Sequence, residues 1–513
     1  MSNRSIPKRT MAAAGLVVVT ALAMSGCMTG TWLGTPQGTT PPPTIQPGDP
    51  ALYGQSVVWE PCPDVATAAD CATIKAPMDW GQPDGQTIDI ALARLSAREP
   101  DQRIGSLLLN PGGPGASGIE MLSYFSSTAG SAVRDAYDLL AFDPRGVGAS
   151  TAVTCYKTTE ELDAFWGASW APTPEGFEAS RAVLEPFAQA CAENTGPVLA
   201  YIDTGSAARD MDLIRAVLGD ERLYYLGYSY GTELGATYAE LFPEKVGRLV
   251  LDGAVDPSLP AEAHDLAQAR GFQQALEAYV EDCLEGTDCP LTGPKANALE
   301  QINTLLLQIE DQPLPGDDTR ELTVPLAMNG LLVTMYEDSV WYVLTQALQL
   351  AFMGDGSGLL MLSDLYLDRE PVVGYTNNSM EAFIAIGCLD ARPPADIASV
   401  QAQAQAFKEA APTFGEFWGY GEMLCEVWPH PQVGEPGPVS ATGAEPILVI
   451  GTTGDPATPY EWAVALAEQL ESGVLLTYEG NGHTAYGRSN QCVVDVVDAF
   501  LVEGMVPPDG TKC

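Results

Sequence analysis

Short, continuous runs of apolar residues recur in the first half and the last part of this 513-residue chain. Each run ends in a loop rich in Gly and Pro, and the runs lie at residues 106–110, 137–143, 223–229, 248–254, 446–452 and 473–480. Strands that are apolar on both faces are typical of a parallel sheet covered by helices on both sides. Segments with helical periodicity, such as GSAARDMDLIRAVLG, lie between the runs. The pattern predicts an α/β fold with a mostly parallel, doubly wound sheet.

This alternation of strands and helices is interrupted between residues 258 and 445. The interruption contains no repeated strand signal, and it holds amphipathic helical patterns at 264–284, 295–312, 329–352 and 397–411. We expect residues 258–445 to form a mostly helical cap domain over the ends of the strands. Residues 55–257 and 446–513 would then fold together as a single catalytic domain.

The beginning of the chain has the pattern of an export signal. A basic stretch, NRSIPKR, precedes residues 11–24, which are apolar or small, and MSGC then ends at Cys27. This predicts a secretory signal peptide. A cysteine at the cleavage point resembles the lipobox of bacterial lipoproteins, although Met24 stands where that motif usually has Leu. Lipid at Cys27 would anchor the protein to the outer face of the membrane, through a Gly/Thr/Pro-rich tether at 28–54; the alternative is a secreted protein.

Export makes disulfide bonds plausible. With Cys27 assigned to lipid, an even number of the 11 cysteines remains. Pairing each with its neighbour along the chain gives Cys62–Cys71, Cys155–Cys191, Cys283–Cys289, Cys388–Cys425 and Cys492–Cys513. The sequence leaves other connectivities open. It offers no C-x-x-C pair and only three distant histidines, so no metal site is expected.

The composition is strongly acidic, with 67 Asp and Glu against 24 Lys and Arg and a formal net charge of −43. Such a surface repels phosphate backbones, which excludes a nucleic-acid partner. Acidity of this kind keeps a protein soluble. It would also attract cationic peptides.

The stretch GYSYGTELG, residues 227–235, contains the first candidate for chemistry. A G-x-S-x-G match arises by chance roughly 0.3 times in a chain with this glycine content, so its context must decide. Here the match follows an apolar strand and precedes a helix, which is the setting of a nucleophile elbow. Gly227 and Gly231 leave the tight turn free of side chains. We therefore predict that Ser229 is a nucleophile; the alternative is an ordinary turn serine.

A serine nucleophile needs a base and an acid that orients the base. His483 in GNGHTAYG and Asp455 in GTTGDPATP each follow one of the last two predicted strands, at the sheet edge where Ser229 would lie. The chain order Ser, Asp, His is that of α/β-hydrolases. His483 would accept the serine proton, and Asp455 would hold the imidazole tautomer. His264 and His430 fall in the predicted cap, where we expect structural roles.

The oxyanion of an acyl-transfer intermediate needs backbone donors. The loop NPGGPGASG, residues 110–118, follows a predicted strand, and its glycines let the backbone approach a substrate. We expect donors from Gly113 and Tyr230, with Gly112 beside them. A second Gly-rich loop, FDPRGVGAS, contains Arg145, for which we expect structural hydrogen bonds.

Together, NPGGPGASG, FDPRGVGAS, GYSYGTELGATYAELFP, RLVLDGAVDP, GTTGDPATP and GNGHTAYG resemble the secreted bacterial tripeptidyl aminopeptidases, which are α/β-hydrolases related to the proline iminopeptidases. The resemblance spans about residues 55–513. It implies an α/β-hydrolase domain with a helical cap, and a serine exopeptidase without metal or organic cofactor. Such an enzyme removes short peptides, here tripeptides, from free N-termini through an acyl-enzyme. Asn110–Pro111 replaces the first residue of the iminopeptidase HGGPG loop, which argues against removal of a single proline.

An aminopeptidase must also bind a cationic amino group, which in a water-poor site requires a carboxylate. Acidic cap residues do this in the related iminopeptidases, and Asp390 and Glu337 are the candidates here. Two other functions stay open: a carboxylesterase or lipase with the same machinery, and a non-catalytic envelope lipoprotein that binds peptides. The sequence leaves the oligomeric state open.

Overall fold

The computed structural model describes residues 50–63, 69–169, 174–317, 319–390, 397–418, 423–434 and 436–513. The predicted leader, Cys27 and most of the predicted tether lie outside these residues. The end of the tether forms the short helix α1 (Pro50–Tyr53). Among the described residues, no helix combines the length and the apolarity needed to cross a membrane.

A ten-stranded sheet forms the centre of the described structure. In spatial order its strands are β1 (Glu60–Pro61), β2 (Asp70–Pro77), β3 (Thr87–Leu95), β5 (Tyr137–Phe142), β4 (Gly105–Asn110), β6 (Leu223–Tyr228), β7 (Val246–Asp252), β12 (Ile447–Gly454), β13 (Gly473–Asn481) and β14 (Thr511–Lys512). The pairs β1–β2, β2–β3 and β3–β5 are antiparallel, and every later pair is parallel. The apolar runs of the sequence are the parallel strands, which confirms the predicted fold class.

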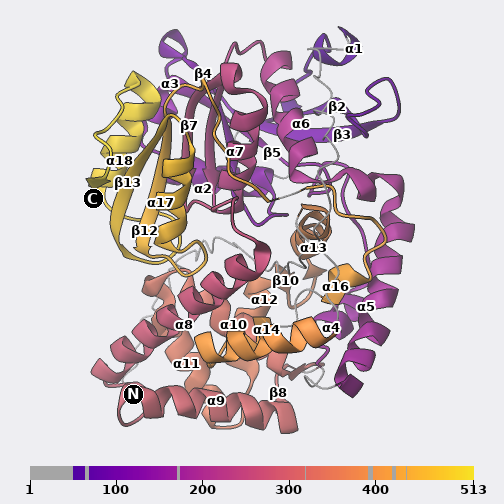
Figure 1. The fold of residues 1–513 in the computed structure, drawn as a ribbon, viewed down its shortest axis with the longest axis vertical. Coiled ribbons are helices and arrows are strands. Elements are labelled where there is room, and N and C mark those ends of the chain that lie inside the picture. Colours follow the sequence, from indigo (N-terminus) through magenta and orange to yellow (C-terminus); the bar gives the residue numbers. More distant parts are fainter. Residues whose placement is uncertain are drawn as a thin grey trace, which may run out of the picture.

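Helices cover both faces of this sheet (Figure 1). One layer consists of α2 (Gly118–Thr128), α3 (Ser131–Ala136) and α18 (Gln491–Asp498), and the other of α6 (Thr204–Val217), α7 (Tyr230–Leu241) and α17 (Tyr460–Gln469). Strand β4 shows why its sequence is continuously apolar. Leu107 and Leu109 face the first layer and Leu108 faces the second, and none of the three is more than 1% exposed. A side chain of either orientation is therefore buried.

Residues 258–445, which we call the cap segment, are mostly helical and lie beyond one end of the sheet (Figure 1). Their elements are α8 (Ala261–Glu285), α9 (Lys295–Asp311), α10 (Val324–Met335), α11 (Trp341–Phe352), α12 (Ser357–Tyr366), α13 (Ser379–Asp390), α14 (Ile397–Ala410), α15 (Gly415–Trp418), α16 (Met423–Glu426) and the small hairpins β8–β9 (Leu314–Pro315, Glu321–Leu322) and β10–β11 (Arg369–Glu370, Gly374–Tyr375). A hydrophobic core of its own, which includes Phe272, Leu331 and Leu344, holds these helices together.

The predicted helix over 329–352 is interrupted in the structure. Helix α10 ends at Met335, and the short 3₁₀ turn η4 (Asp338–Val340) precedes α11. The Glu337 side chain accepts the backbone N–H of Ser339, which begins a new helical segment. Acidic side chains that bond nearby backbone groups compete with the continuous helix in this way.

Two helices from the chain before Ser229 also contact the cap segment: α4 (Thr159–Trp166) and α5 (Pro174–Thr195). The carboxylate of Asp163 on α4 accepts hydrogen bonds from Arg369 at 2.7 and 2.9 Å and from the Tyr375 hydroxyl at 3.0 Å. The helical layer over the strand ends therefore draws on chain outside residues 258–445.

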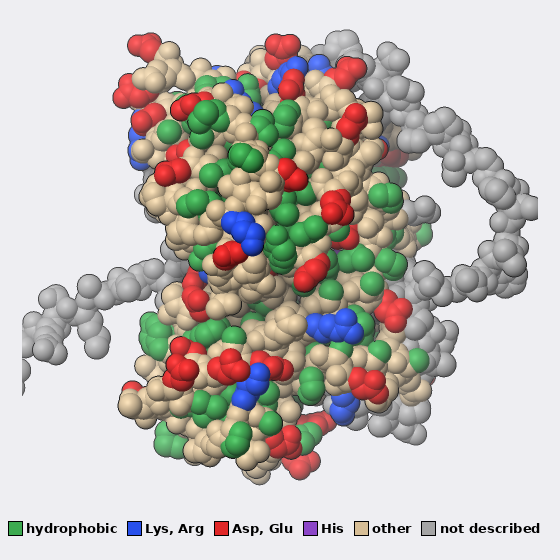
Figure 2. All heavy atoms as spheres, turned by 60° about the vertical axis from the view of Figure 1, so that its left-hand side comes forward, with side chains coloured by type: hydrophobic (Ala, Val, Ile, Leu, Met, Phe, Trp, Pro, Cys, Tyr) green, Lys and Arg blue, Asp and Glu red, His purple; other side chains and the backbone are tan. Residues whose placement is uncertain are grey.

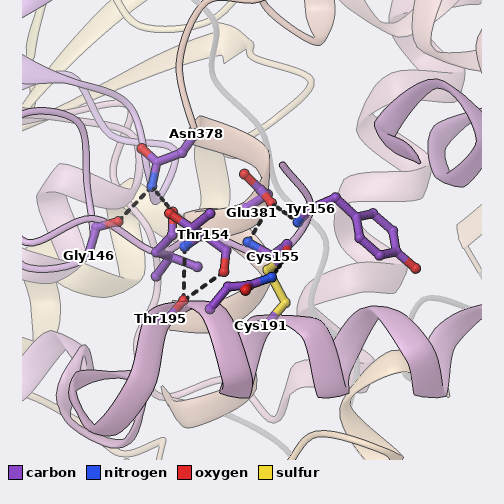
Figure 3. Close-up of a disulfide and its surroundings, with 10 residues drawn as sticks. Gly146, Thr154, Cys155, Tyr156, Cys191, Thr195, Asn378 and Glu381 are labelled. Carbon is purple, nitrogen blue, oxygen red and sulfur yellow. Dashed lines mark hydrogen bonds between the residues drawn. A yellow bond between two sulfur atoms is a disulfide. The ribbon is translucent and has the colours of Figure 1, made fainter. Parts of the chain in front are cut away.

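Asn378, the residue before α13, joins the cap segment to the second Gly-rich loop (Figure 3). Its Oδ1 accepts the N–H of Gly148 at 2.9 Å, and its Nδ2 donates to the carbonyls of Gly146 at 2.9 Å and Val153 at 2.8 Å. One amide thus satisfies three backbone groups of a buried loop, groups that would otherwise be costly to bury.

Glu381, one turn further along α13, binds the same stretch of chain (Figure 3). Its Oε1 accepts the N–H groups of Cys155 at 2.8 Å and Tyr156 at 3.1 Å. Burial raises the pKa of Glu381 to about 7, although both hydrogen bonds oppose the shift. The disulfide Cys155–Cys191 ties this stretch to α5, so α13 rests on a braced loop.

The structure joins the cysteines in the pairs that neighbour-pairing gave: Cys62–Cys71, Cys155–Cys191, Cys283–Cys289, Cys388–Cys425 and Cys492–Cys513. Two pairs brace the cap segment and three brace the remaining chain.

Arg145 has the structural role expected from its loop. The guanidinium is fully buried, and two of its nitrogens each donate to Asp210 at 2.7 Å. It also donates to the carbonyls of Pro77, Met78 and Tyr201 at 2.7–3.1 Å. Burial raises the pKa of Asp210, against the charge of Arg145. This ion pair connects the end of β2 to α6.

Replacing Arg145 with Met should strongly destabilise the fold. The substitution removes the cation that pairs with the Asp210 carboxylate, which keeps only the Trp80 Nε1 donor at 3.0 Å, and it leaves three carbonyls without the donors of Arg145. The expected cost is about 3–5 kcal/mol in the free energy of unfolding. Chemical denaturation measures this loss. The control is Arg222→Gln, which breaks an exposed pair with Glu445 and should cost at most about 1 kcal/mol. Equal losses in the two variants would contradict the assignment.

Candidate active site

Ser229 lies on a tight turn between β6 and α7. Its backbone has φ 55° and ψ −125°, a conformation that is strained for any residue except glycine. The turn is held by the Ser229 N–H, which donates to the Asp252 carbonyl at 2.9 Å, and by Thr232, whose N–H and hydroxyl donate to the Ser229 carbonyl. A Cβ at Gly227 would collide with the carbonyl oxygen of Gly231, so the turn requires glycine there. This is the strand–turn–helix arrangement expected of a nucleophile elbow.

His483 and Asp455 form a buried pair on the loops after β13 and β12. The Nδ1 of His483 is 2.9 Å from both carboxylate oxygens of Asp455. The carboxylate also accepts the N–H groups of Ala457, Thr458 and Thr484 at 2.8–3.0 Å and the Thr458 hydroxyl at 3.0 Å. A carboxylate in this position can accept the imidazole proton on Nδ1, which leaves Nε2 to accept another proton.

The Nε2 atom of His483 is buried and has no hydrogen-bond partner among the described residues. Ser229 and His483 flank the same turn: Ser229 bonds the carbonyl of Asp252, and a Cβ at Gly253 would lie 3.3 Å from Cε1 of the imidazole. The serine hydroxyl and Nε2 are not hydrogen-bonded to each other in the structure. Such bonds often tighten only in the complex with substrate. This unpartnered nitrogen is the candidate acceptor for the serine proton.

Asp252, at the end of β7, belongs to the site although the sequence did not single it out. Its carboxylate accepts the N–H of Ala485 at 2.9 Å and the N–H of Tyr486 at 2.7 Å, which fixes the chain just after His483. Burial raises the pKa of Asp252 to about 6, against these backbone hydrogen bonds. The available signal was an acid at the carboxyl end of the strand that follows the elbow, in RLVLDG.

The loop after β4 lies against the nucleophile. Gly112 and Gly113 have φ values of 97° and 106°, and a Cβ at Gly112 would lie 3.0 Å from the Cβ of Ser229. The Gly112 N–H donates to Oδ1 of Asn110 at 2.9 Å and is therefore occupied. The N–H groups of Gly113 and Tyr230 have no acceptor within the described part of the chain. Those two are the donors expected for an oxyanion, and Gly112 supplies close approach.

The two acids considered for binding a substrate amine both have protein partners. The oxygens of Asp390 accept the N–H of Thr204 at 2.9 Å and its hydroxyl at 2.6 Å, and that hydroxyl also contacts the hydroxyl of Tyr230. Burial raises the pKa of Asp390 well above its ordinary value. Glu337 accepts a hydrogen bond from Nε of Arg488 at 3.0 Å. Asp390 is buried with its partners, whereas the Glu337 side chain is 35% exposed, and amine binding by either acid stays a prediction.

The other two histidines lie apart from this arrangement. His264 on α8 stacks against Trp462, with ring centroids 4.3 Å apart. His430 is partly buried in the cap segment, and burial lowers its pKa.

The fold and this geometry define a serine hydrolase of the α/β-hydrolase class, and comparison with known proteins agrees. A family profile described as "TAP-like protein" matches residues 411–513. The serine protease Hip1 of Mycobacterium tuberculosis is 38% identical over 478 residues, which cover 90% of this chain and 91% of Hip1. Carboxylesterase B of the same organism is 37% identical over 480 residues, with 91% of each chain covered. The tripeptidyl aminopeptidase of Streptomyces lividans is 29% identical over 469 residues, 89% of this chain and 86% of that one.

The chain therefore belongs to this family of TAP-like α/β-hydrolases, as its sequence motifs predicted. Among solved structures, a thermophilic esterase from Thermogutta terrifontis aligns with 84% of this chain and 98% of its own, at 12% identity and a TM-score of 0.36.

Substitution of the site residues should remove activity in graded steps. Ser229→Ala should abolish covalent labelling by a fluorophosphonate and reduce turnover by about 10⁶-fold. Asp455→Asn should reduce turnover by about 10⁴-fold, because the imidazole loses its orienting carboxylate. Gel fluorescence and steady-state kinetics measure both effects. Ser127→Ala, at an exposed serine on α2, serves as the control and should be labelled like the wild type. Undiminished labelling of Ser229→Ala would refute the assignment.

Asp252→Asn should change how stability depends on pH. Folding raises the pKa of Asp252 from 3.8 to about 6, so the folded state favours the protonated carboxyl group. The contribution of Asp252 to the free energy of unfolding therefore falls as the pH rises through this interval. Asn keeps an oxygen that accepts N–H groups but cannot ionise. The Tm of the variant relative to the wild type should therefore rise between about pH 4 and pH 7. Scanning calorimetry at several pH values tests this; a pH-independent difference would contradict it.

Proposed function

We propose that this protein is an extracytoplasmic serine exopeptidase that removes short peptides, tripeptides in the simplest case, from free N-termini. Ser229 attacks the peptide carbonyl while His483 takes the hydroxyl proton, and the N–H groups of Gly113 and Tyr230 bind the oxyanion. His483 then protonates the leaving amine. Water releases the acyl-enzyme through the same groups in reverse.

The observation that carries this proposal is that Ser229 is buried and that the cap segment contacts the loop of His483. Ser229 and His483 are each only 4% exposed, and the His483 N–H donates at 2.9 Å to the carbonyl of Tyr336 in the cap segment. We propose that residues 258–445 act as a cap domain on a catalytic domain of residues 55–257 and 446–513. A covered site of this kind admits the end of a peptide more readily than the middle of a folded chain.

The surface charge favours substrates with a cationic end. Acidic side chains are spread over the face in Figure 2 with few Lys and Arg between them, in keeping with the 67 acids and 24 bases of the chain. A field of this sign attracts protonated amino termini and accelerates their encounter with the protein. Relatives named tripeptidyl aminopeptidase and serine protease support peptide substrates.

Location outside the cytoplasm is part of the same proposal. The disulfides of the structure are typical of oxidising compartments. The leader pattern supports export, and lipid at Cys27 would anchor the enzyme through its tether.

A carboxylesterase is the second candidate, because one relative at 37% identity carries that name. Ester and amide hydrolysis pass through the same tetrahedral intermediate, so the site geometry serves both. The substrate must therefore decide.

Blocking the substrate amine should separate the two functions. A tripeptide p-nitroanilide with a free N-terminus should be cleaved with a kcat/KM about 10²-fold higher than its N-acetylated form. Acetylation removes the ammonium charge and the charge-assisted hydrogen bonds that it donates, which are worth about 1.5–3 kcal/mol. The release of p-nitroaniline measures both rates. Mass spectrometry of products from longer peptides with free N-termini then gives the length removed in each step.

Equal rates on the free and acetylated anilides would refute the exopeptidase. Fast hydrolysis of p-nitrophenyl acetate with no cleavage of either anilide would favour the carboxylesterase.

A further inference from the structure

The loop that carries His483 is held from both sides by one arginine. Arg488 donates through Nη1 to the carbonyl of Thr484 at 2.8 Å and through Nη2 to the carbonyl of Asn481 at 2.8 Å. These carbonyls stand on either side of His483. The Arg488 side chain is only 11% exposed, and its hydrogen bond to Thr484 is partly buried, whereas the one to Asn481 lies at the surface.

A third donor of Arg488 reaches the cap segment. Its Nε donates to Oε2 of Glu337 at 3.0 Å. Burial would raise the pKa of Glu337, but the hydrogen bond and the charge of Arg488 lower it below its ordinary value. The carboxylate is therefore ionised at neutral pH, and the contact is a charge-assisted hydrogen bond.

The residue before Glu337 touches the histidine itself. The carbonyl of Tyr336 accepts the backbone N–H of His483 at 2.9 Å, and the tyrosine ring meets the imidazole edge-on with centroids 5.5 Å apart. Two consecutive residues of the cap segment thus hold the loop, one directly and one through Arg488. They lie where the predicted helix is interrupted.

The missing side chain at Gly482 allows both groups to approach the loop closely. Its φ is +95°, and a Cβ there would collide with Nη2 of Arg488 and lie 2.9 Å from the Tyr336 carbonyl. The loop is thus narrow where the arginine and the cap segment meet it. A shift of either one would displace the imidazole.

We propose that Arg488 and Glu337 are positioning residues for His483, so that the base is aligned with Ser229 only while the cap segment is seated on the catalytic domain. The inference rests on the triad of the proposed function. It assigns Glu337 to the histidine loop and leaves it no part in binding a substrate amine.

The test compares Arg488→Gln, Glu337→Gln, the double variant and Arg488→Lys on two substrates. One is p-nitrophenyl acetate, which has no amine, and the other is a tripeptide p-nitroanilide with a free N-terminus. Misplacement of a catalytic group by about 1 Å costs about 10²-fold, so Arg488→Gln should lower kcat by about that factor on both substrates, with little change in KM. Glu337→Gln should lower kcat by about 10-fold on both, because the amide still accepts a hydrogen bond but lacks the charge.

The double variant should be no slower than Arg488→Gln, because Glu337 acts only through the arginine. Arg488→Lys should recover part of the lost kcat, since one ammonium can serve one carbonyl or the carboxylate but not all three acceptors. Arg222→Gln, which removes an exposed arginine that also pairs with a glutamate and a carbonyl, should match the wild type. Thermal unfolding shows which variants are folded.

Three results would overturn the proposal. The first is an unchanged kcat in Arg488→Gln, and the second is a double variant whose loss in kcat is the product of the two single losses. The third is a Glu337→Gln variant in which only the KM for the free-amine substrate changes. The last would return Glu337 to amine binding. If Arg488→Gln does not fold, the cycle of Glu337→Gln with Arg488→Lys decides, because Glu337 is 35% exposed and lies outside the core. Hydrolysis of p-nitrophenyl acetate tests the inference even without cleavage of the tripeptide anilide. Failure to cleave the anilide would refute only the proposed exopeptidase.

Discussion

The hydrogen bonds between Asp455 and His483 are the constraint on which the site depends. Both carboxylate oxygens lie 2.9 Å from Nδ1 in a place where the two side chains are almost fully buried. A buried carboxylate requires hydrogen-bond donors, and the loop backbone at residues 457, 458 and 484 provides them. The parallel register of β7, β12 and β13 brings these loops to one edge. Sheet, loops and acid thus fix the imidazole at the edge of the sheet that also carries the strained serine.

Much of the fold and of the candidate site could be predicted from the sequence because local sequence patterns encode them. Continuous apolar runs gave the parallel strands within one or two residues, and glycine spacing gave the elbow at Ser229. The loops of Asp455 and His483 follow strands, so their common edge comes from fold topology. The neighbouring cysteines also meet in the structure as pairs.

What the sequence did not reveal depends on contacts between distant segments. The partner of Glu337 is 151 positions away, and Asp390 is held by Thr204, 186 positions away. From sequence, both acids were candidates for an amine, since an acid in a helical segment gives no sign of its partner. Asp252 was missed for the same reason: it serves backbone groups that lie 233 and 234 positions later. The positions of α4 and α5 beside the cap segment also depend on tertiary contacts, such as those of Asp163 with Arg369 and of Arg181 with Glu426.

The order of the disulfides along the chain has a consequence for biogenesis. Every bond joins two cysteines that are consecutive among the paired ones, and the enclosed loops span only 6 to 37 positions. In the proposed export, with the amino end of the chain first through a translocation channel, the partners of one bond would emerge before the next pair. Oxidation in order of appearance would then give the connectivity of the structure without an isomerase to reshuffle the thiols.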